Sequence, residues 1–204
     1  MSTLQVAPTS TKAAQYAVTK WHYSESLPVP PRTLFGVWEH GKFIGVVIFS
    51  RGASRDLGTP YGLTQTECCE LTRVALSEHD APVTQIVAEA FKQLRKHSPG
   101  LRLVVSFADP HHGHHGGIYQ AGNWLYLGES SPSVEYIDRN GVRWHPRQVS
   151  ETGFRKQFGA NRRSPKPSEM KKVKTPGKHR YVMPLDKNMR RRLKSKAQPY
   201  PQAM

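Results

Sequence analysis

Residues 101–107 read Leu-Arg-Leu-Val-Val-Ser-Phe, a nearly continuous apolar run in the middle of a chain of 204 residues. Such a run is typical of a central strand whose sheet is covered on both faces. Before it, the apolar residues of 83–94 recur with helical spacing directly after Pro82, a residue that favours the start of a helix. Another β-rich run, 70–76, comes before that helix. The order strand, helix, strand predicts an α/β (α+β) fold with a central sheet flanked by helices.

Further elements are expected on both sides of this centre. Ser10 or Thr11 is a plausible cap for a helix over 11–23, and 34–38 with 43–49 form a predicted hairpin. Residues 51–66 make a long polar loop, and ordered loops of that length are usually functional. The remaining expected elements are a short helix around 117–121, a strand over 124–128, a hairpin over 136–144 and a basic helix over 187–196.

Positive charge is unevenly distributed along the chain. The 30 Lys and Arg outnumber the 15 Asp and Glu, and from Arg155 onward sixteen basic residues face only Glu169 and Asp186. This is the footprint of a surface that binds a polyanion. A solvated, disordered tail is the alternative. A membrane is not expected, because the chain has no apolar run long enough to span one.

The charge divides the chain into a nearly neutral body, 1–154, and a basic nucleic-acid-binding region, 155–204, which is expected to return to the sheet through a strand over 180–185. Phosphate contacts would give affinity and position. The residues expected to bind nucleic acid are Arg51, Arg55, Arg162, Arg163, Lys171, Lys172, Lys174 and Arg180.

The run 116–124, Gly-Gly-Ile-Tyr-Gln-Ala-Gly-Asn-Trp, is similar to a pattern of the GNAT acyltransferases. Within that superfamily, the chain resembles the Mom proteins of Mu-like bacteriophages over most of 11–150. The blocks that carry this resemblance are Trp21–Ser24, Phe35–Phe49, Glu70–Val74, Val105–Asp109 and His115–Gly117. The resemblance implies a GNAT-like single domain with 1–154 as its catalytic body. It also implies an enzyme that converts adenine in double-stranded DNA, its expected partner, to the carbamoylmethylated form, which protects phage DNA from host restriction. The adjacent Cys68 and Cys69 and a first segment without a signal peptide agree with the host cytoplasm.

One departure from the superfamily concerns the acyl donor. GNAT enzymes usually hold the pyrophosphate of coenzyme A on a glycine-rich loop at a helix N-terminus. Residues 77–82 here read Ser-Glu-His-Asp-Ala-Pro, without glycine, which argues against coenzyme A. A carbamoylmethyl group on the adenine amine is an isomer of a glycyl group on it. Glycyl-tRNA is therefore a candidate donor, with acetyl-CoA followed by amination as the alternative and tRNA as a possible second partner.

Five residues are candidates for catalysis. Because the target amine lies in the base stack, an enzyme must extrude the adenine and hold it by stacking and hydrogen bonds. His22 is a candidate base and Tyr23 a stacking or proton-handling group, whereas an aromatic pair that caps the helix is the alternative. Ser106 and Asp109 lie at the end of the central strand. Asp109 either accepts a proton or orients the adenine amine, and the alternative is that it caps the next turn. Tyr119 is either a general acid or a core tyrosine.

Other candidates concern the donor and a metal. Arg73 interrupts an apolar strand, so either Glu70 or a phosphate of the donor must pair with it. Gly116 and Gly117 open the short helix and are expected to bind the donor as well. The histidines at 111, 112, 114 and 115 can ligate a transition metal, but consecutive side chains on a turn rarely converge on one ion. A solvated turn without metal is the prediction.

Two rival functions are consistent with the same sequence. The first is a non-catalytic phage DNA-binding protein on a transferase scaffold, which would tolerate alanine at Ser106, Asp109 and Tyr119. The second is an ordinary N-acyltransferase that uses coenzyme A on a protein or a small molecule.

Overall fold

The computed structural model of the chain describes residues 4–52, 54–110, 113–157 and 159–202. Contacts between residues divide the chain into two compact units. Unit 1 comprises 1–108, 115–128 and 179–204, and unit 2 comprises 109–114 and 129–178. The change in charge at Arg155 therefore falls inside unit 2 and does not coincide with the edge of either unit.

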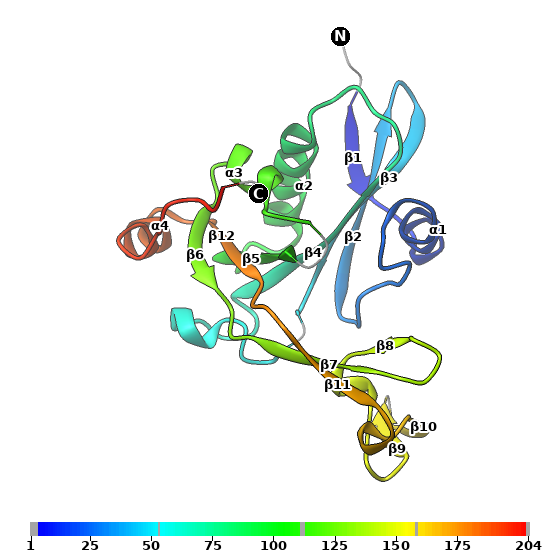
Figure 1. Ribbon diagram of the computed structural model, residues 1–204. Helices are drawn as coiled ribbons and strands as arrows, with labels where there is room; N and C mark the ends of the chain where they lie inside the picture. Colours follow the sequence, from blue (N-terminus) through cyan, green and yellow to red (C-terminus); the bar gives the residue numbers. More distant parts are fainter. Residues whose placement is uncertain (1–3, 53, 111–112, 158, 203–204) are drawn as a thin grey trace. The chain divides into compact units, whose positions relative to one another are not determined.

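Unit 1 is built on a seven-stranded sheet with the order β1-β2-β3-β4-β5-β12-β6 (Figure 1). Neighbouring strands in the described pairings are antiparallel, except for the parallel pair of β4 and β5. The strands are β1 (Gln5–Pro8), β2 (Arg32–Glu39), β3 (Lys42–Ser50), β4 (Cys68–Leu76), β5 (Leu103–Ala108), β6 (Leu125–Glu129) and β12 (His179–Pro184). The α/β class with a mixed central sheet is thus confirmed.

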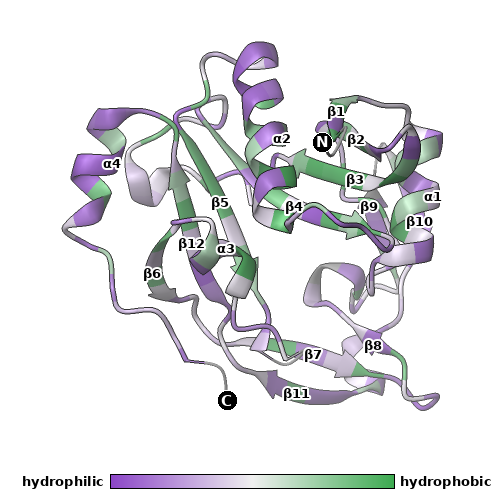
Figure 2. Cartoon of the chain, turned by 90° about the horizontal axis from the view of Figure 1, so that it is seen from above, coloured by the Kyte–Doolittle hydropathy of each residue, from purple (hydrophilic) through white to green (hydrophobic). Residues whose placement is uncertain are grey.

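Helices cover both faces of this sheet, as the apolar run of β5 predicted. The helices are α1 (Thr11–Trp21), α2 (Val83–His97), α3 (Gly117–Ala121) and α4 (Lys187–Lys194), together with the 3-10 turn η1 (Thr59–Tyr61). The buried stripe of α2 packs in one core cluster with Val47 and Phe49 of β3. The alternate residues Val46 and Ile48 point to the opposite face, where α1 covers them. Figure 2 shows β3 and β5 as hydrophobic strands in this core.

Polar side chains cap the N-termini of α1 and α4. The side chain of Ser10 accepts a hydrogen bond from the backbone N–H of Ala13 and caps α1. Asp186 caps α4 in the same way through the N–H of Met189 at 2.7 Å. Met189 and Leu193 of α4 are buried against β5 and β12, while its basic residues face outward. Within the described ranges, no helix has the length and apolarity needed to cross a membrane.

The strand expected over 180–185 is β12, which pairs antiparallel with β5 over its whole length. Tyr181 lies opposite Ser106 in this register. The C-terminal part of the basic region is therefore an inner strand of the main sheet, followed by α4.

Unit 2 contains the other part of the basic region and consists of two small sheets. One has the order β11-β7-β8 and the other is the hairpin β10-β9. Their elements are β7 (Ser133–Ile137), β8 (Arg143–Trp144), η3 (Pro146–Gln148), β9 (Phe154–Gln157), β10 (Ala160–Arg163), η4 (Pro167–Glu169) and β11 (Lys171–Thr175). The hairpin over 136–144 was predicted. The strands β9, β10 and β11 were not, because charged residues fill them and leave no apolar alternation to detect.

Candidate active site

The site begins where β4 and β5 separate. The two strands pair only from Cys68 to Glu70, opposite Leu103 to Val105. Beyond that point β5 stays with β12, and β4 stays with β3 through a shift of register that leaves Thr72 as an extra residue. Ser106 is the first residue of β5 beyond its last pair with β4.

The hydroxyl groups of buried Ser106 and partly buried Tyr119 form a pair where the two strands separate. Ser106 is 1% exposed, and its Oγ lies 2.8 Å from the Leu71 carbonyl oxygen and 2.7 Å from the Tyr119 hydroxyl. Serine has one hydroxyl proton and a carbonyl only accepts, so in this arrangement the Tyr119 hydroxyl donates to Ser106. Burial raises the pKa of Tyr119 to about 12. Tyr119 therefore keeps its proton at neutral pH.

Tyr23, Glu70 and Arg73 of unit 1 interact electrostatically with Tyr119 or with one another. Burial lowers the pKa of Arg73, whereas nearby Tyr23 and Glu70 raise it. Tyr23 and Glu70 also contribute to the raised pKa of Tyr119. Arg73 donates from Nη1 to the Thr72 carbonyl at 2.7 Å and from Nε to the Ser26 carbonyl at 3.4 Å, and so links β4 to the chain after α1.

Electrostatic interactions thus link Tyr23, Arg73 and Tyr119, three of the residues expected from the sequence, with Glu70, and a hydrogen bond links Tyr119 to Ser106. The sequence indicates Glu70 only as a partner for Arg73, although an acid inside a largely apolar strand is itself a signal of function. A Cβ added to Gly52 would lie 2.8 Å from Oε2 of Glu70, so the loop that contains Gly52 approaches the Glu70 carboxylate closely.

His22 stacks on Tyr23, with ring centroids 4.4 Å apart and planes inclined by 28°. Its Nδ1 accepts the backbone N–H of Ser24 at 3.1 Å. In the neutral imidazole the proton is therefore on Nε2, which is then a donor. Tyr23 is 60% exposed, so the alternative of a buried aromatic pair does not hold for it. The other ring nitrogen of His22, Nε2, is therefore a hydrogen-bond donor. To act as a base through Nδ1, His22 would have to lose its hydrogen bond with the Ser24 N–H.

The backbone conformation and the surroundings of residue 116 both require glycine at this position. Its φ is +90°, and a Cβ at this position would collide with the ring of Tyr181. Gly117 is less constrained, because a Cβ added there would lie 3.2 Å from Nε2 of His115. The donor-binding role expected for the two glycines stays a prediction.

Asp109 belongs to unit 2, where it forms an ion pair with Lys178 at 2.7 Å. Its backbone carbonyl accepts the N–H of His114 at 3.1 Å and closes the histidine-rich turn. The partner Lys178 was not foreseen. The catalytic role of Asp109 remains a prediction.

The histidine cluster is described only in part, because His111 and His112 lie outside the described residues. The carbonyl of His115 accepts the Tyr181 hydroxyl at 2.6 Å. In the described chain, the side chains that come close enough together for a metal are instead Glu39, His40 and Asp80, with ligand atoms within 4.8 Å of one another.

Glu39 of that group already has a structural task at the loop before α2. It is 4% exposed, and its two carboxylate oxygens accept the backbone N–H groups of Asp80 and Ala81, each at 2.8 Å. The hydrogen bond from Asp80 is the main cause that lowers the pKa of Glu39. These amides are thus occupied by an internal anion, and Pro82 supplies no N–H. The loop does not fit the pyrophosphate of coenzyme A.

Replacement of Glu39 by Gln is expected to lower the unfolding temperature at neutral pH, because one amide hydrogen would face a backbone donor. The folded pKa of Glu39 lies below its ordinary value of 4.5, so the charged carboxylate stabilises the fold above that value. This contribution is lost as the pH falls through the lowered pKa. Thermal denaturation should therefore show a difference between wild type and variant that shrinks on acidification below 4.5. Glu78→Gln, at an exposed position of the same loop, is the control, and an equal effect of both variants would contradict the assignment.

The residues predicted to bind nucleic acid are found in both units. Arg162, Arg163, Lys171, Lys172 and Lys174 are exposed on β10 and β11 of unit 2. Arg51, Arg55 and Arg180 belong to unit 1, where Arg180 donates to the Leu127 carbonyl at 3.1 Å.

Comparison with known proteins gives one family and several related folds. A family model described as the Mom protein family matches residues 3–202. Methylcarbamoylase mom of Escherichia phage Mu is 27% identical over 206 residues, which covers 97% of this chain and 83% of that protein. An acetyltransferase of Bacillus subtilis, solved in complex with CoA, is 11% identical with a TM-score of 0.48 and covers 91% of this chain and 100% of its own. An acetyltransferase of Thermus thermophilus is 15% identical with a TM-score of 0.45, covering 90% of this chain and 97% of its own.

Proposed function

The chain belongs to the Mom protein family, and on that premise we propose that it is a phage DNA modification enzyme. It transfers an acyl or aminoacyl group to the exocyclic amine of adenine in DNA and yields the N6-carbamoylmethyl base in the host cytoplasm. The observation that carries this proposal is the Ser106–Tyr119 hydrogen bond where β4 and β5 separate, with Tyr23 and Glu70 near enough to raise the pKa of Tyr119. The related phage Mu protein, named a methylcarbamoylase, supports the same chemistry.

The proposed roles follow from the protons that each group holds. Tyr119 remains protonated at neutral pH and can donate to the leaving oxygen or sulfur of the donor. Ser106 accepts from Tyr119 at first, and its hydroxyl can then rotate away from the Leu71 carbonyl to donate to the phenolate. Tyr23, exposed and stacked on His22, is placed to stack on an extruded base. Arg73 supplies a fixed positive charge to a phosphate or an oxyanion.

The donor is proposed from the chemistry of the product and from the loop before α2. In a glycyl transfer, the adenine amine attacks the ester carbonyl of glycyl-tRNA, and the tRNA hydroxyl leaves. The new α-amine then attacks the ring carbon and expels the original nitrogen, which becomes the carboxamide. A pyrophosphate on the Asp80 and Ala81 amides would have to displace Glu39, and this favours a donor held elsewhere. Acetyl-CoA followed by amination is the alternative donor.

Protection of DNA tests the proposed function against the two rivals. Plasmid DNA is isolated from cells that express the chain, freed of protein and digested with endonucleases whose sites contain adenine. We expect resistance to part of this panel, because the modification is covalent and survives the removal of protein. A DNA-binding protein without catalysis, or an acyltransferase acting on another substrate, would leave the purified plasmid fully sensitive.

A further inference from the structure

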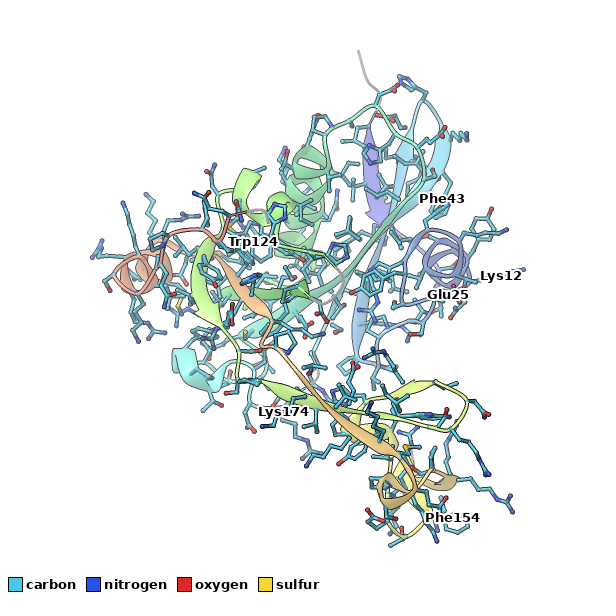
Figure 3. The ribbon with its side chains drawn as sticks, in the orientation of Figure 1. Lys12, Glu25, Phe43, Trp124, Phe154 and Lys174 are labelled. Carbon is cyan, nitrogen blue, oxygen red and sulfur yellow. The ribbon has the colours of Figure 1, made fainter. Side chains whose placement is uncertain are left out.

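The β9–β10 hairpin of unit 2 presents an exposed aromatic ring among cations. Phe154 is 53% exposed and lies opposite Arg163 in the antiparallel register (Figure 3). The next pairs are Arg155 with Arg162 and Lys156 with Asn161. From 154 to 163 the sequence contains no acid. The hairpin thus combines an apolar side chain with positive charge that its own strands do not neutralise.

The arrangement is unfavourable for a hairpin that faces only water. Like charges that lie close together repel one another, and Lys156, Arg162 and Arg163 are all exposed on this hairpin. An exposed phenyl ring keeps a large apolar area in contact with solvent. A bound polyanion removes both costs, provided that it also offers an apolar surface to the ring.

The base of the hairpin is held by local hydrogen bonds. The backbone N–H of Ser164 donates to the Gly153 carbonyl at 2.9 Å, and its hydroxyl donates to the Gln148 carbonyl at 2.6 Å. The hydroxyl of Thr152 donates to the Phe154 carbonyl at 2.9 Å. These contacts fix the backbone that carries Phe154.

Resting on the proposed function, we infer that this hairpin binds duplex DNA with Phe154 as a base-contacting wedge. A two-stranded ribbon fits a DNA groove, and inserted apolar side chains unstack a base step. An enzyme that extrudes adenine must offset the lost stacking of that base. Phe154 supplies the apolar contact, while Arg163 and Lys156 bind phosphates beside it.

The inference is tested by Phe154→Ala in the full-length chain, with fluorescence anisotropy of labelled duplexes that contain either paired or mismatched adenines. We expect Phe154→Ala to bind the paired duplex about tenfold more weakly, in line with the contribution of one aromatic–base stack. The loss should be smaller on the mismatched duplex, because a mismatched base is already partly unstacked. Phe154→Trp should restore binding. Val142→Ala, at another exposed apolar residue of unit 2, should bind like the wild type.

Equal affinity of wild type and Phe154→Ala for the paired duplex would overturn the inference. A loss that is equal on both duplexes would overturn it as well. Because binding needs neither donor nor catalysis, this result is separate from that of the protection assay. An unmodified plasmid together with the expected binding losses would refute the proposed function and leave the hairpin assignment standing.

Discussion

Tyr119→Phe is expected to lower the rate of adenine modification by about a hundredfold to ten-thousandfold, the usual range for loss of a general acid. The ring should keep its place, since it packs 5.0 Å from Trp124 and 5.1 Å from Tyr181 between centroids. Removal of the hydroxyl costs about 1 kcal/mol of stability, the typical value of one buried hydrogen bond. The rate is measured as the fraction of modified deoxyadenosine formed per unit of expressed protein.

A matched control separates this loss from a general effect of removing a buried hydroxyl. Tyr126 lies in the same core cluster, and its hydroxyl contacts Nδ1 of His179 at 3.1 Å, apart from the Ser106–Tyr119 pair. Tyr126→Phe should therefore retain most of the activity. If Tyr119→Phe modified DNA at the wild-type rate, the assignment of Tyr119 as proton donor would be refuted.

Replacement of Lys171, Lys172 and Lys174 together by Gln is expected to weaken DNA binding and to reduce its dependence on salt. All three are exposed on β11, which pairs with β7 through its backbone, so unit 2 should remain folded. Each phosphate contact contributes about 0.9 to the slope of log affinity against log salt concentration, so loss of all three reduces the slope by about 2.7. Titrations of a labelled duplex at several salt concentrations measure this change.

The control removes the same charge from unit 1. Lys12, Lys20 and Lys42 are also exposed, and their joint replacement by Gln changes the net charge equally. If both triple variants gave the same slope, the affinity would depend on total charge, and β11 would have no specific role in binding.

The centre of the fold was predictable because its physical signals are local and redundant. The run 101–107 is nearly continuously apolar and contains most of β5, and the helical stripe after Pro82 became α2. The returning strand was visible as an apolar island in a basic region and became β12. In contrast, β9 and β11 are rich in charged residues and hold their places by backbone pairing, a pattern that apolar periodicity does not reveal.

The site was predictable in its residue types and less so in its contacts. Ser106 and Tyr119 were both selected, but their hydrogen bond depends on the packing of α3 beside β5 and has no sequence signature. Glu39 was overlooked because an acid at the end of a strand usually faces solvent, and only the fold brings it to the amides of the loop before α2. Glu70 was missed as a site residue for a similar reason, since it lies on β4 and acts electrostatically on Tyr119 of α3, which is distant in the sequence.

The most direct test of adenine modification is mass spectrometry of nucleosides from plasmid DNA of cells that express the chain. The wild type should yield a deoxyadenosine derivative heavier by one carbamoylmethyl group in place of a hydrogen, and Tyr119→Phe should yield almost none of it. A deoxyadenosine pool that stays unmodified in the presence of well-expressed, folded wild-type protein would contradict the proposed function.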